Sequence, residues 1–360
     1  MYNGVREVLP LMKSVVLRQV GSVQIEEFDP PRLEDPGDAI VKVTIAGICG
    51  SDLHIIHGRD PGIRMGTIMG HEFTGVVQEK GASVSGLEVG DRVVSPFTVN
   101  CGKCFYCSRN LPARCIHSQG FGFITESGAG LHGAQAEYVR VPLASSTLMK
   151  IPDGLSDEEV LFLGDIFSTA YSSAENAGIG KGDVVVVTGC GPVGLLCVKS
   201  ALLFEPSVVF ALDTVEYRLE KARSLGATAL RPDSPQLVDM ILAATGGRGA
   251  DAVLEAVGSP LALDLALRVI RPCATVSIAG YHTETSYTFP IQYAYTKNLT
   301  LKIGRCNAGH YMRKLLPLVA DRRVTLTDII THVLPLQDGV RGYDIFGRRL
   351  ENAVKVLLKP

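Results

Sequence analysis

Four closely spaced cysteines form the most specific chemical pattern in this sequence. Cys101, Cys104, Cys107 and Cys115 lie in the segment CGKCFYCSRNLPARC. Two residues separate Cys101 from Cys104 and Cys104 from Cys107, and at this spacing neighbouring thiolates converge on one tetrahedral ion that the fourth thiolate, from Cys115, can close. Disulfides would need a secreted context, which nothing in the sequence supports, and an iron–sulfur cluster usually draws its fourth ligand from further away. We therefore expect a closed zinc site, which performs no chemistry itself.

A second group of possible metal ligands precedes the cysteine cluster. The segment GICGSDLH contains Cys49, Ser51 and His54, and the segment GHEFTGVV contains His71 and Glu72. A thiolate and an imidazole are good zinc ligands, but two ligands do not make a site. Taken alone, Cys49 reads as a small buried apolar residue and His71 as a core histidine.

A glycine-rich segment, GCGPVG, separates an apolar strand-like run from an apolar helix-like run. Gly189 permits a tight turn, Gly191 lets a pyrophosphate approach the backbone, and Gly194 lets the helix lie close to the strand. The next strand-like run, VVFALD, ends in Asp213, where a carboxylate can bind both ribose hydroxyls of NAD and repel the 2′-phosphate of NADP. Asp213 can also cap the following helix, and the two roles are compatible. We expect NAD in preference to NADP.

Length and composition narrow the class of protein. A chain of 360 residues predicts two domains, and 35 Lys and Arg against 37 Asp and Glu, with no basic run, argues against nucleic-acid binding. The N-terminal segment MYNGVREVLPLMKS has too short an apolar stretch for a signal peptide, and GLLCVKSALLF is too short to span a membrane. We expect a cytoplasmic protein with neither nucleic acid nor membrane as a partner.

The hydrophobic pattern divides the chain into a strand-rich part and an alternating part. Residues 39–47 and 134–141 read as strands, and helical patterning begins near residue 155, where Ser156 and Glu159 form a capping box. From Asp183 onward, apolar strands such as VVVVTG, VVFALD, DAVLEAVG and ATVSIAG alternate with helices. This alternation predicts an α/β fold with a doubly wound parallel sheet.

Together these motifs resemble those of the zinc-dependent medium-chain dehydrogenase/reductase superfamily, the alcohol dehydrogenases. ICGSDLH, GHEFTGVV, the spaced cysteines, VGDRV, TGCGPVG and the strand end at Asp213 occur in the family's order over nearly the whole chain. The resemblance implies a mostly-β, GroES-like catalytic domain formed by residues 1–165 and 306–360, and a Rossmann domain formed by residues 166–305. It also implies a homotetramer, with a dimer as the alternative.

The resemblance assigns Cys49 and His71 as ligands of a catalytic zinc. Asp165 occupies the place of the third ligand, where some branches carry cysteine, and its alternative role is a helix-surface carboxylate. Glu72 is the alternate ligand, because in the family the glutamate after the histidine can enter the coordination shell. A Cys/His/Asp set leaves one position open for substrate. The sequence therefore implies two zinc ions per chain, one catalytic and one structural.

Further roles follow from the same resemblance. Ser51 would hydrogen-bond the reacting oxygen, His54 would take the proton through the ribose hydroxyls, and Asp52 would support the ligands. Lys355 stands where relatives place a basic phosphate partner, although it also reads as a solvated strand charge. The residues expected to contact the cofactor are Gly189, Gly191, Pro192, Val193, Gly194, Asp213, Arg218, Val257 and Lys355.

The implied reaction is reversible hydride transfer between an alcohol and NAD, giving a ketone or an aldehyde. The substrate would be a secondary alcohol, a polyol or a small primary alcohol, and formaldehyde or threonine dehydrogenase is the alternative within the family. A zinc-free NADPH-dependent quinone or enone reductase shares the fold, but Cys49, His71 and Asp213 argue against it. The rival from another class is a non-catalytic NAD(H)-binding scaffold or sensor.

Overall fold

The computed structural model describes residues 11–360, so most of the apolar stretch considered as a signal-peptide core lies outside the described residues. Within residues 11–360, no helix is both long enough and apolar enough to cross a membrane. The chain forms two compact units. The first comprises Met1–Leu161, His332–Arg348 and Val356–Pro360, and the second comprises Phe162–Thr331 and Arg349–Lys355. The family resemblance assigns residues 1–165 and 306–360 to a catalytic domain and residues 166–305 to a cofactor-binding domain. These functional assignments stay predictions.

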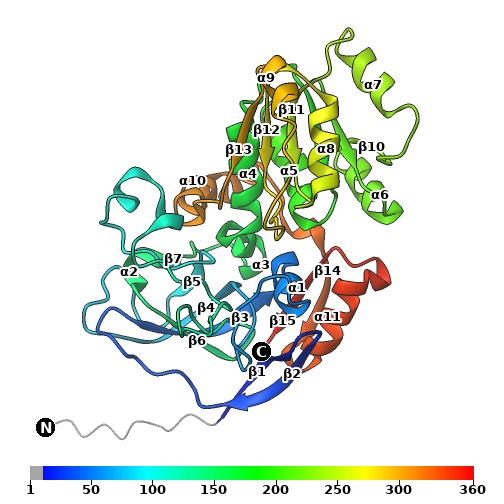
Figure 1. Ribbon diagram of the computed structural model, residues 1–360. Helices are drawn as coiled ribbons and strands as arrows, with labels where there is room; N and C mark the ends of the chain where they lie inside the picture. The colour runs from blue at the N-terminus through cyan, green and yellow to red at the C-terminus, as the bar shows by residue number, and fades with distance from the viewer. Residues whose placement is uncertain (1–10) are drawn as a thin grey trace, which may run out of the picture. The chain divides into compact units, whose positions relative to one another are not determined.

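The first unit is built mainly from antiparallel strands (Figure 1). Its strands are β1 (Met12–Gln19), β2 (Ser22–Phe28), β3 (Ala39–Gly47), β4 (Glu72–Lys80), β5 (Arg92–Ser95), β6 (Tyr138–Val141) and β7 (Met149–Lys150). β1 and β2 form a hairpin, and the main sheet has the order β14-β15-β3-β4-β5-β7, with β6 paired to β3; β14 (Ile330–Pro335) and β15 (Lys355–Lys359) come from the end of the chain. The unit's helices are α1 (Gly50–Ile56), α2 (Ala144–Thr147), α3 (Asp157–Val160) and α11 (Gly339–Arg348).

The register of β3 against β4 brings distant parts of the sequence together. The two strands run antiparallel, and Gly47 at the end of β3 lies opposite Glu72 at the start of β4. Apolar side chains of β3 and β4 face a buried core in which the rings of Phe73 and Phe121 meet edge to face at 5.2 Å. The residues that directly follow β3 and those that directly precede β4 are therefore held close together by the paired strands.

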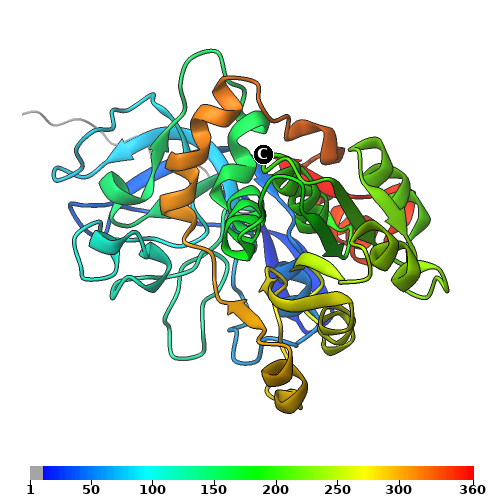
Figure 2. The same cartoon turned by 90° about the horizontal axis from the view of Figure 1, so that it is seen from above.

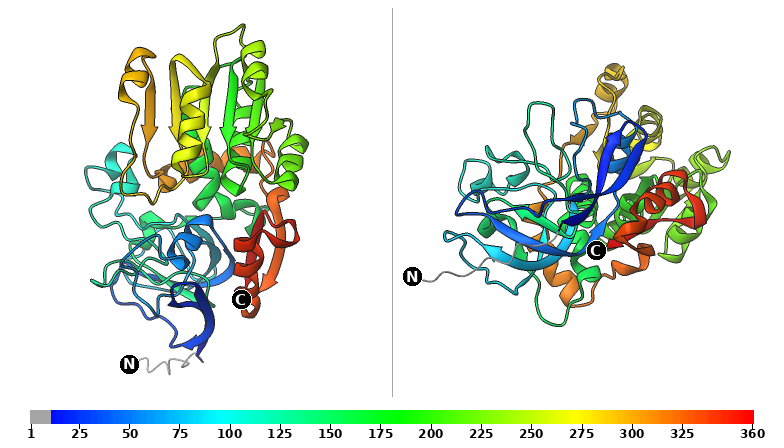
Figure 3. Two further views of the ribbon diagram at one scale, coloured as in Figure 1. Left: turned by 45° about the vertical axis from the view of Figure 1, so that its right-hand side comes forward. Right: turned by 90° about the horizontal axis from the view of Figure 1, so that it is seen from below.

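The second unit contains a six-stranded sheet in the order β10-β9-β8-β11-β12-β13, and every neighbouring pair is parallel. The strands are β8 (Val184–Thr188), β9 (Val208–Leu212), β10 (Thr228–Leu230), β11 (Ala250–Glu255), β12 (Ile270–Ile278) and β13 (Thr300–Ile303). The helices are α4 (Ile166–Ala177), α5 (Pro192–Leu202), α6 (Glu216–Ser224), α7 (Leu237–Ala244), α8 (Pro260–Val269), α9 (Ile291–Thr296) and α10 (Ala308–Ala320). Figures 2 and 3 show helices on both sides of this sheet. This arrangement is the predicted doubly wound, Rossmann-type sheet.

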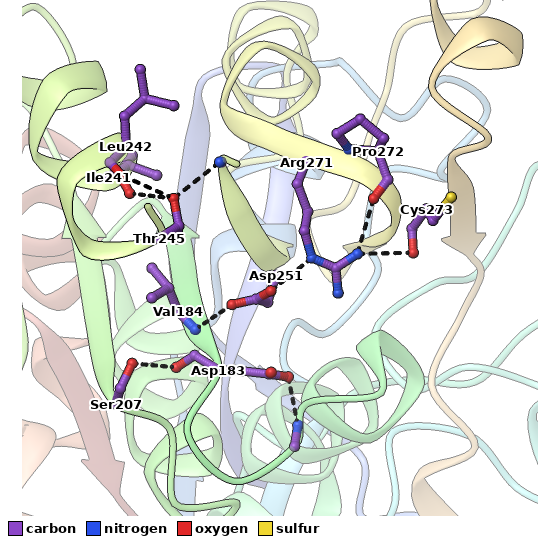
Figure 4. Close-up of polar contacts among 12 residues, drawn as sticks. Asp183, Val184, Ser207, Ile241, Leu242, Thr245, Asp251, Arg271, Pro272 and Cys273 are labelled. Atoms are coloured by element: carbon purple, nitrogen blue, oxygen red, sulfur yellow. Dashed lines mark hydrogen bonds and ion pairs between the residues drawn. The ribbon is translucent and has the colours of Figure 1, made fainter. Parts of the chain in front are cut away.

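A partly buried carboxylate ties the amino ends of three strands together (Figure 4). Asp251 on β11 accepts a hydrogen bond from the backbone N–H of Val184 at 2.8 Å and another from Nε of Arg271 at 2.6 Å. The Arg271 guanidinium also donates to the carbonyls of Pro272 and Cys273. Because these contacts fix the amino ends of β8, β11 and β12, the opposite ends of the strands are held in register for the loops that follow them.

Two sequence-based elements differ from the structure. The expected strand over residues 134–141 shortens to β6, because residues 134 and 135 hydrogen-bond through their backbone to the loop at Met69 and Gly70. The helical pattern after residue 155 is broken into α3, a short 3-10 turn and α4, with non-helical backbone at Asp165 (φ −150°, ψ −86°). The predicted capping box of Ser156 and Glu159 is confirmed.

Candidate metal centre and cofactor loop

Three metal-ligating side chains converge at the β3–β4 edge of the first unit. Cys49 follows β3 and precedes α1, His71 comes directly before β4, and Glu72 is the first residue of β4. One ligand atom from each of these residues lies within 4.8 Å of the others. All three side chains are buried, with exposed fractions of 8%, 3% and 0%. A thiolate, an imidazole and a carboxylate held this close together form a donor set suited to zinc.

The carboxylate of Glu72 packs against the backbone of Gly47, which has no side chain. A Cβ added to Gly47 would lie 2.1 Å from Oε2 of Glu72, so only glycine leaves room for this side chain. The register of β3 against β4 sets this pairing, because Gly47 and Glu72 are direct partners. The position of Glu72 is therefore a consequence of the sheet, and its role as an alternate ligand stays a prediction.

Ser51 and Asp52 lie on either side of the His71 ring. Oγ of Ser51 is 3.3 Å from Nε2 of His71, and Oδ1 of Asp52 is 3.2 Å from Nδ1. The second oxygen of Asp52 accepts the backbone N–H of Cys49 at 3.0 Å, as part of the capping box that starts α1. The ring of Phe123 packs beside the imidazole at 5.8 Å between centroids. His54 lies one turn further along α1.

Asp165 belongs to the second unit, where it precedes the first turn of α4 as its N-cap. Its Oδ1 accepts a hydrogen bond from the Thr169 hydroxyl at 3.4 Å, and the backbone N–H of Thr169 donates to its carbonyl at 2.8 Å. Asp165 thus begins a helix in the structure, and its membership of the ligand set stays a prediction.

The four cysteines of the lobe between residues 101 and 115 come together as predicted. Their sulfur atoms all lie within 4.8 Å of one another. Backbone N–H groups of Cys107 and Ile116 hold the pKa of Cys104 at about 6, whereas burial raises the pKa of Cys107 to about 12. The nine cysteines all fall within residues 11–360, and none of them is in a disulfide there. A tetrahedral cage of four thiolates fits zinc, and its occupation is a proposal.

The glycine-rich segment makes the turn expected of a dinucleotide loop. Gly189 has a φ of +88°, and Gly191 caps α5, which begins at Pro192 and continues through Val193. A Cβ on Gly194 would lie 1.8 Å from the carbonyl oxygen of Gly189, so the helix can start this close to the strand only with glycine there. The amino end of α5 faces out of this turn, where backbone N–H groups and the helix dipole favour a phosphate.

Asp213 follows β9 and is held by two backbone N–H groups. Its Oδ2 accepts from Cys190 in the glycine turn at 2.7 Å, and its Oδ1 accepts from Val215, the N-cap residue of α6, at 2.9 Å. Nη1 of Arg218 lies 3.9 Å from Oδ2. Asp213 is not the N-cap of α6, which is Val215 and has no side-chain cap bond, but the two backbone contacts fix the Asp213 carboxylate beside the turn. The ribose contacts of Asp213 and Arg218 stay predictions.

The remaining predicted cofactor residues differ in exposure. Val257 follows β11 and is 48% exposed. Its side chain lies beside the Gly189 turn, where a Cβ on Gly189 would come within 2.7 Å of Cγ2 of Val257. Lys355 is fully buried, with Nζ 5.5 Å from the centre of the Phe162 ring, so the interpretation as a solvated strand charge was wrong. Its contact with a phosphate stays a prediction.

Sequence reasoning missed several buried polar residues. Oε1 of Glu255 accepts from the backbone of Val257 and Gly258 at 2.8 Å each, and its Oε2 lies 3.2 Å from Nε2 of His282. Burial raises the pKa of Glu255. Gln135 and Tyr343 lie behind the His71 site and were also missed. The available signal was a polar residue inside an otherwise small or apolar run, as in AVLEAVG and GAQAEY.

Comparison with known proteins finds two matching family models and related dehydrogenases. Residues 35–153 match the family described as alcohol dehydrogenase GroES-like domain, and residues 192–321 match zinc-binding dehydrogenase. Zinc-type alcohol dehydrogenase B of Aspergillus flavus is 40% identical over 353 residues, covering 96% of this chain and 80% of the relative. The chain belongs to the zinc-dependent medium-chain dehydrogenase family.

Solved structures of this family show the same fold. Alcohol dehydrogenase TADH from Thermus sp. ATN1 is 40% identical, with a TM-score of 0.90 and coverage of 96% of this chain and 99% of that one. A zinc-binding dehydrogenase from Sinorhizobium meliloti 1021, solved with NADP bound, is 26% identical, with a TM-score of 0.84 and coverage of 98% of this chain and 100% of that one. As a medium-chain dehydrogenase, the protein is an oxidoreductase of mixed α/β fold, with a GroES-like domain and a Rossmann-like parallel sheet.

Proposed function

We propose that the protein is an NAD-dependent zinc alcohol dehydrogenase that interconverts an alcohol with its ketone or aldehyde. The observation that carries the proposal is the convergence of Cys49, His71 and Glu72, whose ligand atoms lie within 4.8 Å of one another beside the hydroxyl of Ser51. The family membership supports zinc and a small alcohol or carbonyl compound as the reactants.

Cys49 and His71 would hold the catalytic zinc, with Asp165 as the proposed third ligand and Glu72 as the alternate one. When bound, zinc supplies a Lewis acid that lowers the pKa of an alcohol. The second proposed ion would occupy the cysteine lobe, where the four sulfur atoms already form a cage. Four thiolates in the lobe, and a thiolate with an imidazole in the other set, fit zinc better than magnesium or calcium.

The chain's own residues provide a route for the proton. Oγ of Ser51 lies 3.3 Å from Nε2 of His71, so the hydroxyl is placed beside the ligand set, where it can accept the proton of a substrate hydroxyl as it passes its own proton on toward His54. His54, on the same helix, is the proposed final acceptor. The fixed position of Ser51 in the first turn of α1 limits the number of orientations that the hydroxyl must search.

The cofactor proposal rests on the second unit. Gly189, Gly191 and Gly194 leave room for a pyrophosphate at the start of α5, and the Asp213 carboxylate lies beside that turn. A negative charge at this place favours the free ribose hydroxyls of NAD over the 2′-phosphate of NADP. Arg218, whose Nη1 is 3.9 Å from Oδ2 of Asp213, moderates this charge, so the preference is graded.

Substrate panels test the proposed reaction. Secondary alcohols, polyols, threonine and formaldehyde are incubated with NAD while NADH absorbance is followed, with and without a chelator. We expect turnover on at least one class, loss with chelator, and loss in Cys49→Ala and His71→Ala variants that still bind NADH. Cys273→Ala, which removes an exposed thiol, should keep wild-type activity. Turnover confined to threonine or formaldehyde would select the alternative function, and silence across the panel would favour a non-catalytic NAD(H)-binding protein.

The proposed assembly is a homotetramer or a dimer, and the proposed location is the cytoplasm. The edge strand β13 leaves Ile303 71% exposed, which is consistent with a homotetramer or a dimer formed along this edge. The thiolate cage of the cysteine lobe needs reduced sulfur, so a cytoplasmic location fits the chemistry.

A further inference from the structure

We propose that Gln135 and Tyr343 are positioning residues for the metal ligand His71, which they orient through Asp52. The inference rests on the proposed function, because it concerns the same metal centre. All four side chains belong to the first unit and are buried, with exposed fractions between 0% and 6%. They come from four separate segments of the chain, so no local sequence pattern links them.

Gln135 is the central residue of this network. Its Nε2 donates to the carbonyl of Gly47 at 3.0 Å and to Oδ2 of Asp52 at 3.4 Å, while its Oε1 accepts from the Tyr343 hydroxyl at 2.8 Å. Its backbone N–H donates to the carbonyl of Met69 at 2.9 Å. One fully buried amide thus connects the end of β3, helix α1, the segment before His71 and helix α11.

The backbone next to His71 is shaped to admit this amide. Gly70 has a φ of +92°, and a Cβ there would lie 2.4 Å from Cγ of Gln135 and 3.0 Å from its Nε2. Glycine is therefore required at the position before the ligand for two reasons, its conformation and the Gln135 side chain. The contact couples the place of Gln135 directly to the backbone that carries the imidazole.

Tyr343 fixes the orientation of the amide. Burial raises the pKa of Tyr343 well above its usual value, and the nearby charge of Asp52 acts in the same direction, so the phenol stays protonated and donates its hydrogen to Oε1 of Gln135. Because Oε1 accepts from the phenol, the NH₂ group must face Asp52 and Gly47. A hydroxyl on the C-terminal helix thereby decides which end of the amide faces the carboxylate.

Asp52 connects Gln135 to the proposed metal ligands Cys49 and His71. Oδ2 accepts hydrogen bonds from Nε2 of Gln135 and from the backbone N–H of Cys49, and Oδ1 lies 3.2 Å from Nδ1 of His71. A carboxylate on Nδ1 fixes the tautomer in which Nε2 offers its lone pair to a metal. Loss of the amide would let the carboxylate rotate, and the orientation of His71 would be less well defined.

The test measures metal retention as well as turnover. Zinc release from the purified, fully metallated enzyme to an indicator chelator is followed in the wild type and in Tyr343→Phe and Gln135→Leu variants, and the Cys104→Ser variant identifies the phase that comes from the cysteine lobe. We expect the other phase to accelerate about tenfold in Gln135→Leu and less in Tyr343→Phe, with the lobe phase unchanged. NADH affinity should stay at the wild-type value, while kcat falls more than KM changes.

Tyr293→Phe is the matched control, because its hydroxyl also donates one hydrogen bond, to the carbonyl of Leu267 at 3.0 Å, outside this network. In the double variant Gln135→Leu/Tyr343→Phe, removal of the phenol should add nothing to the effect of Gln135→Leu. Tyr343→Phe keeps the shape of the side chain, so its zinc release rate tests the inference even if Gln135→Leu folds poorly.

Wild-type release rates in Tyr343→Phe and Gln135→Leu would overturn the inference and leave the proposed function intact. Equal acceleration of both phases would also overturn it, because that result indicates general loosening. A wild-type enzyme that held zinc only in the cysteine lobe would overturn the inference and the proposed function together.

Discussion

Both oxygens of the Asp213 carboxylate are already hydrogen-bonded within the chain, to the backbone of Cys190 and of Val215. The residue therefore does two things at once. It holds the glycine turn against the start of α6, and it places a negative charge where the adenosine ribose is proposed to lie. A substitution at this position must affect both, and the two effects can be separated by comparing cofactors.

Asp213→Ser should raise the ratio of kcat/KM with NADP to that with NAD by about tenfold, which corresponds to about 1.4 kcal/mol. The physical reason is the removal of a charge that repels the 2′-phosphate while Arg218 remains 13% exposed beside it. Both cofactors should bind less tightly, because the turn loses its bond from Cys190. Asp233→Ser is the control, since Asp233 is an exposed partner of Arg231. An unchanged ratio would refute the ribose role.

His132 provides a residue-scale prediction about pH. Its Nδ1 accepts the backbone N–H of Ile68 at 3.1 Å, which requires a neutral ring. Burial lowers the pKa of His132, and the charge of Arg64 adds to this effect. Because the folded-state pKa is depressed, the unfolded chain binds more protons below the ordinary imidazole value of about 6.5. The contribution of this residue to stability is therefore complete above that pH and is lost as the pH falls through the folded-state value.

We expect the melting temperature of the wild type to fall more steeply between pH 7 and pH 5 than that of His132→Asn, whose side-chain oxygen can still accept a bond without titrating. Scanning calorimetry across this range checks the prediction. Parallel pH profiles for the two proteins would show that His132 titrates alike in the folded and unfolded chain.

At the scale of elements, the cysteine lobe is a separate small structure held by its thiols. Its only regular pieces within the described chain are two 3-10 turns, Cys107–Arg109 and Pro112–Arg114, and large apolar side chains such as Phe105 (61%) and Ile116 (68%) are exposed. A segment with so little buried surface needs another source of folding energy, and the proposed structural zinc would supply it.

Cys104→Ser should lower the metal content by about one ion per chain and should lower the melting temperature, because three thiolates no longer close a tetrahedral cage. Cys273→Ser, at an exposed cysteine outside the lobe, should change neither quantity. Plasma emission spectrometry on both purified variants decides between these results. An unaltered metal content in Cys104→Ser would count against a second ion.

Sequence reasoning predicted some elements correctly and missed contacts between distant parts of the chain. Strands β3, β8 and β9, the capping box at Ser156 and the cysteine cage were predictable, because each depends on residues close together in the sequence. The convergence of Cys49 with His71 was implied only by the family resemblance, because the register of β3 against β4 produces it. Gln135 could not be predicted, since its role depends on Tyr343, which lies 208 positions away. The break at Asp165 was missed because the hydrophobic pattern continues through it.

At the scale of the whole molecule, the edges of the parallel sheet set how copies can associate. β10 and β13 are the two edge strands of the second unit. β13 is short and exposes Thr300, Lys302 and Ile303 to solvent. An unpaired edge with an exposed apolar side chain is a natural place for a second copy to add its own strand, which would extend the sheet across a twofold axis.

Ile303→Lys should shift the assembly toward smaller species, because a charged side chain at a strand edge opposes pairing and removes an apolar contact. Size-exclusion chromatography with light scattering gives the mass of each protein, and we expect a dimer from a tetramer, or a monomer from a dimer. Val333→Lys is the control, since Val333 is a half-exposed apolar residue of β14 in the other sheet. An identical mass for the wild type and Ile303→Lys at low protein concentration would place the interface elsewhere, and a mass change in Val333→Lys alone would assign it to β14.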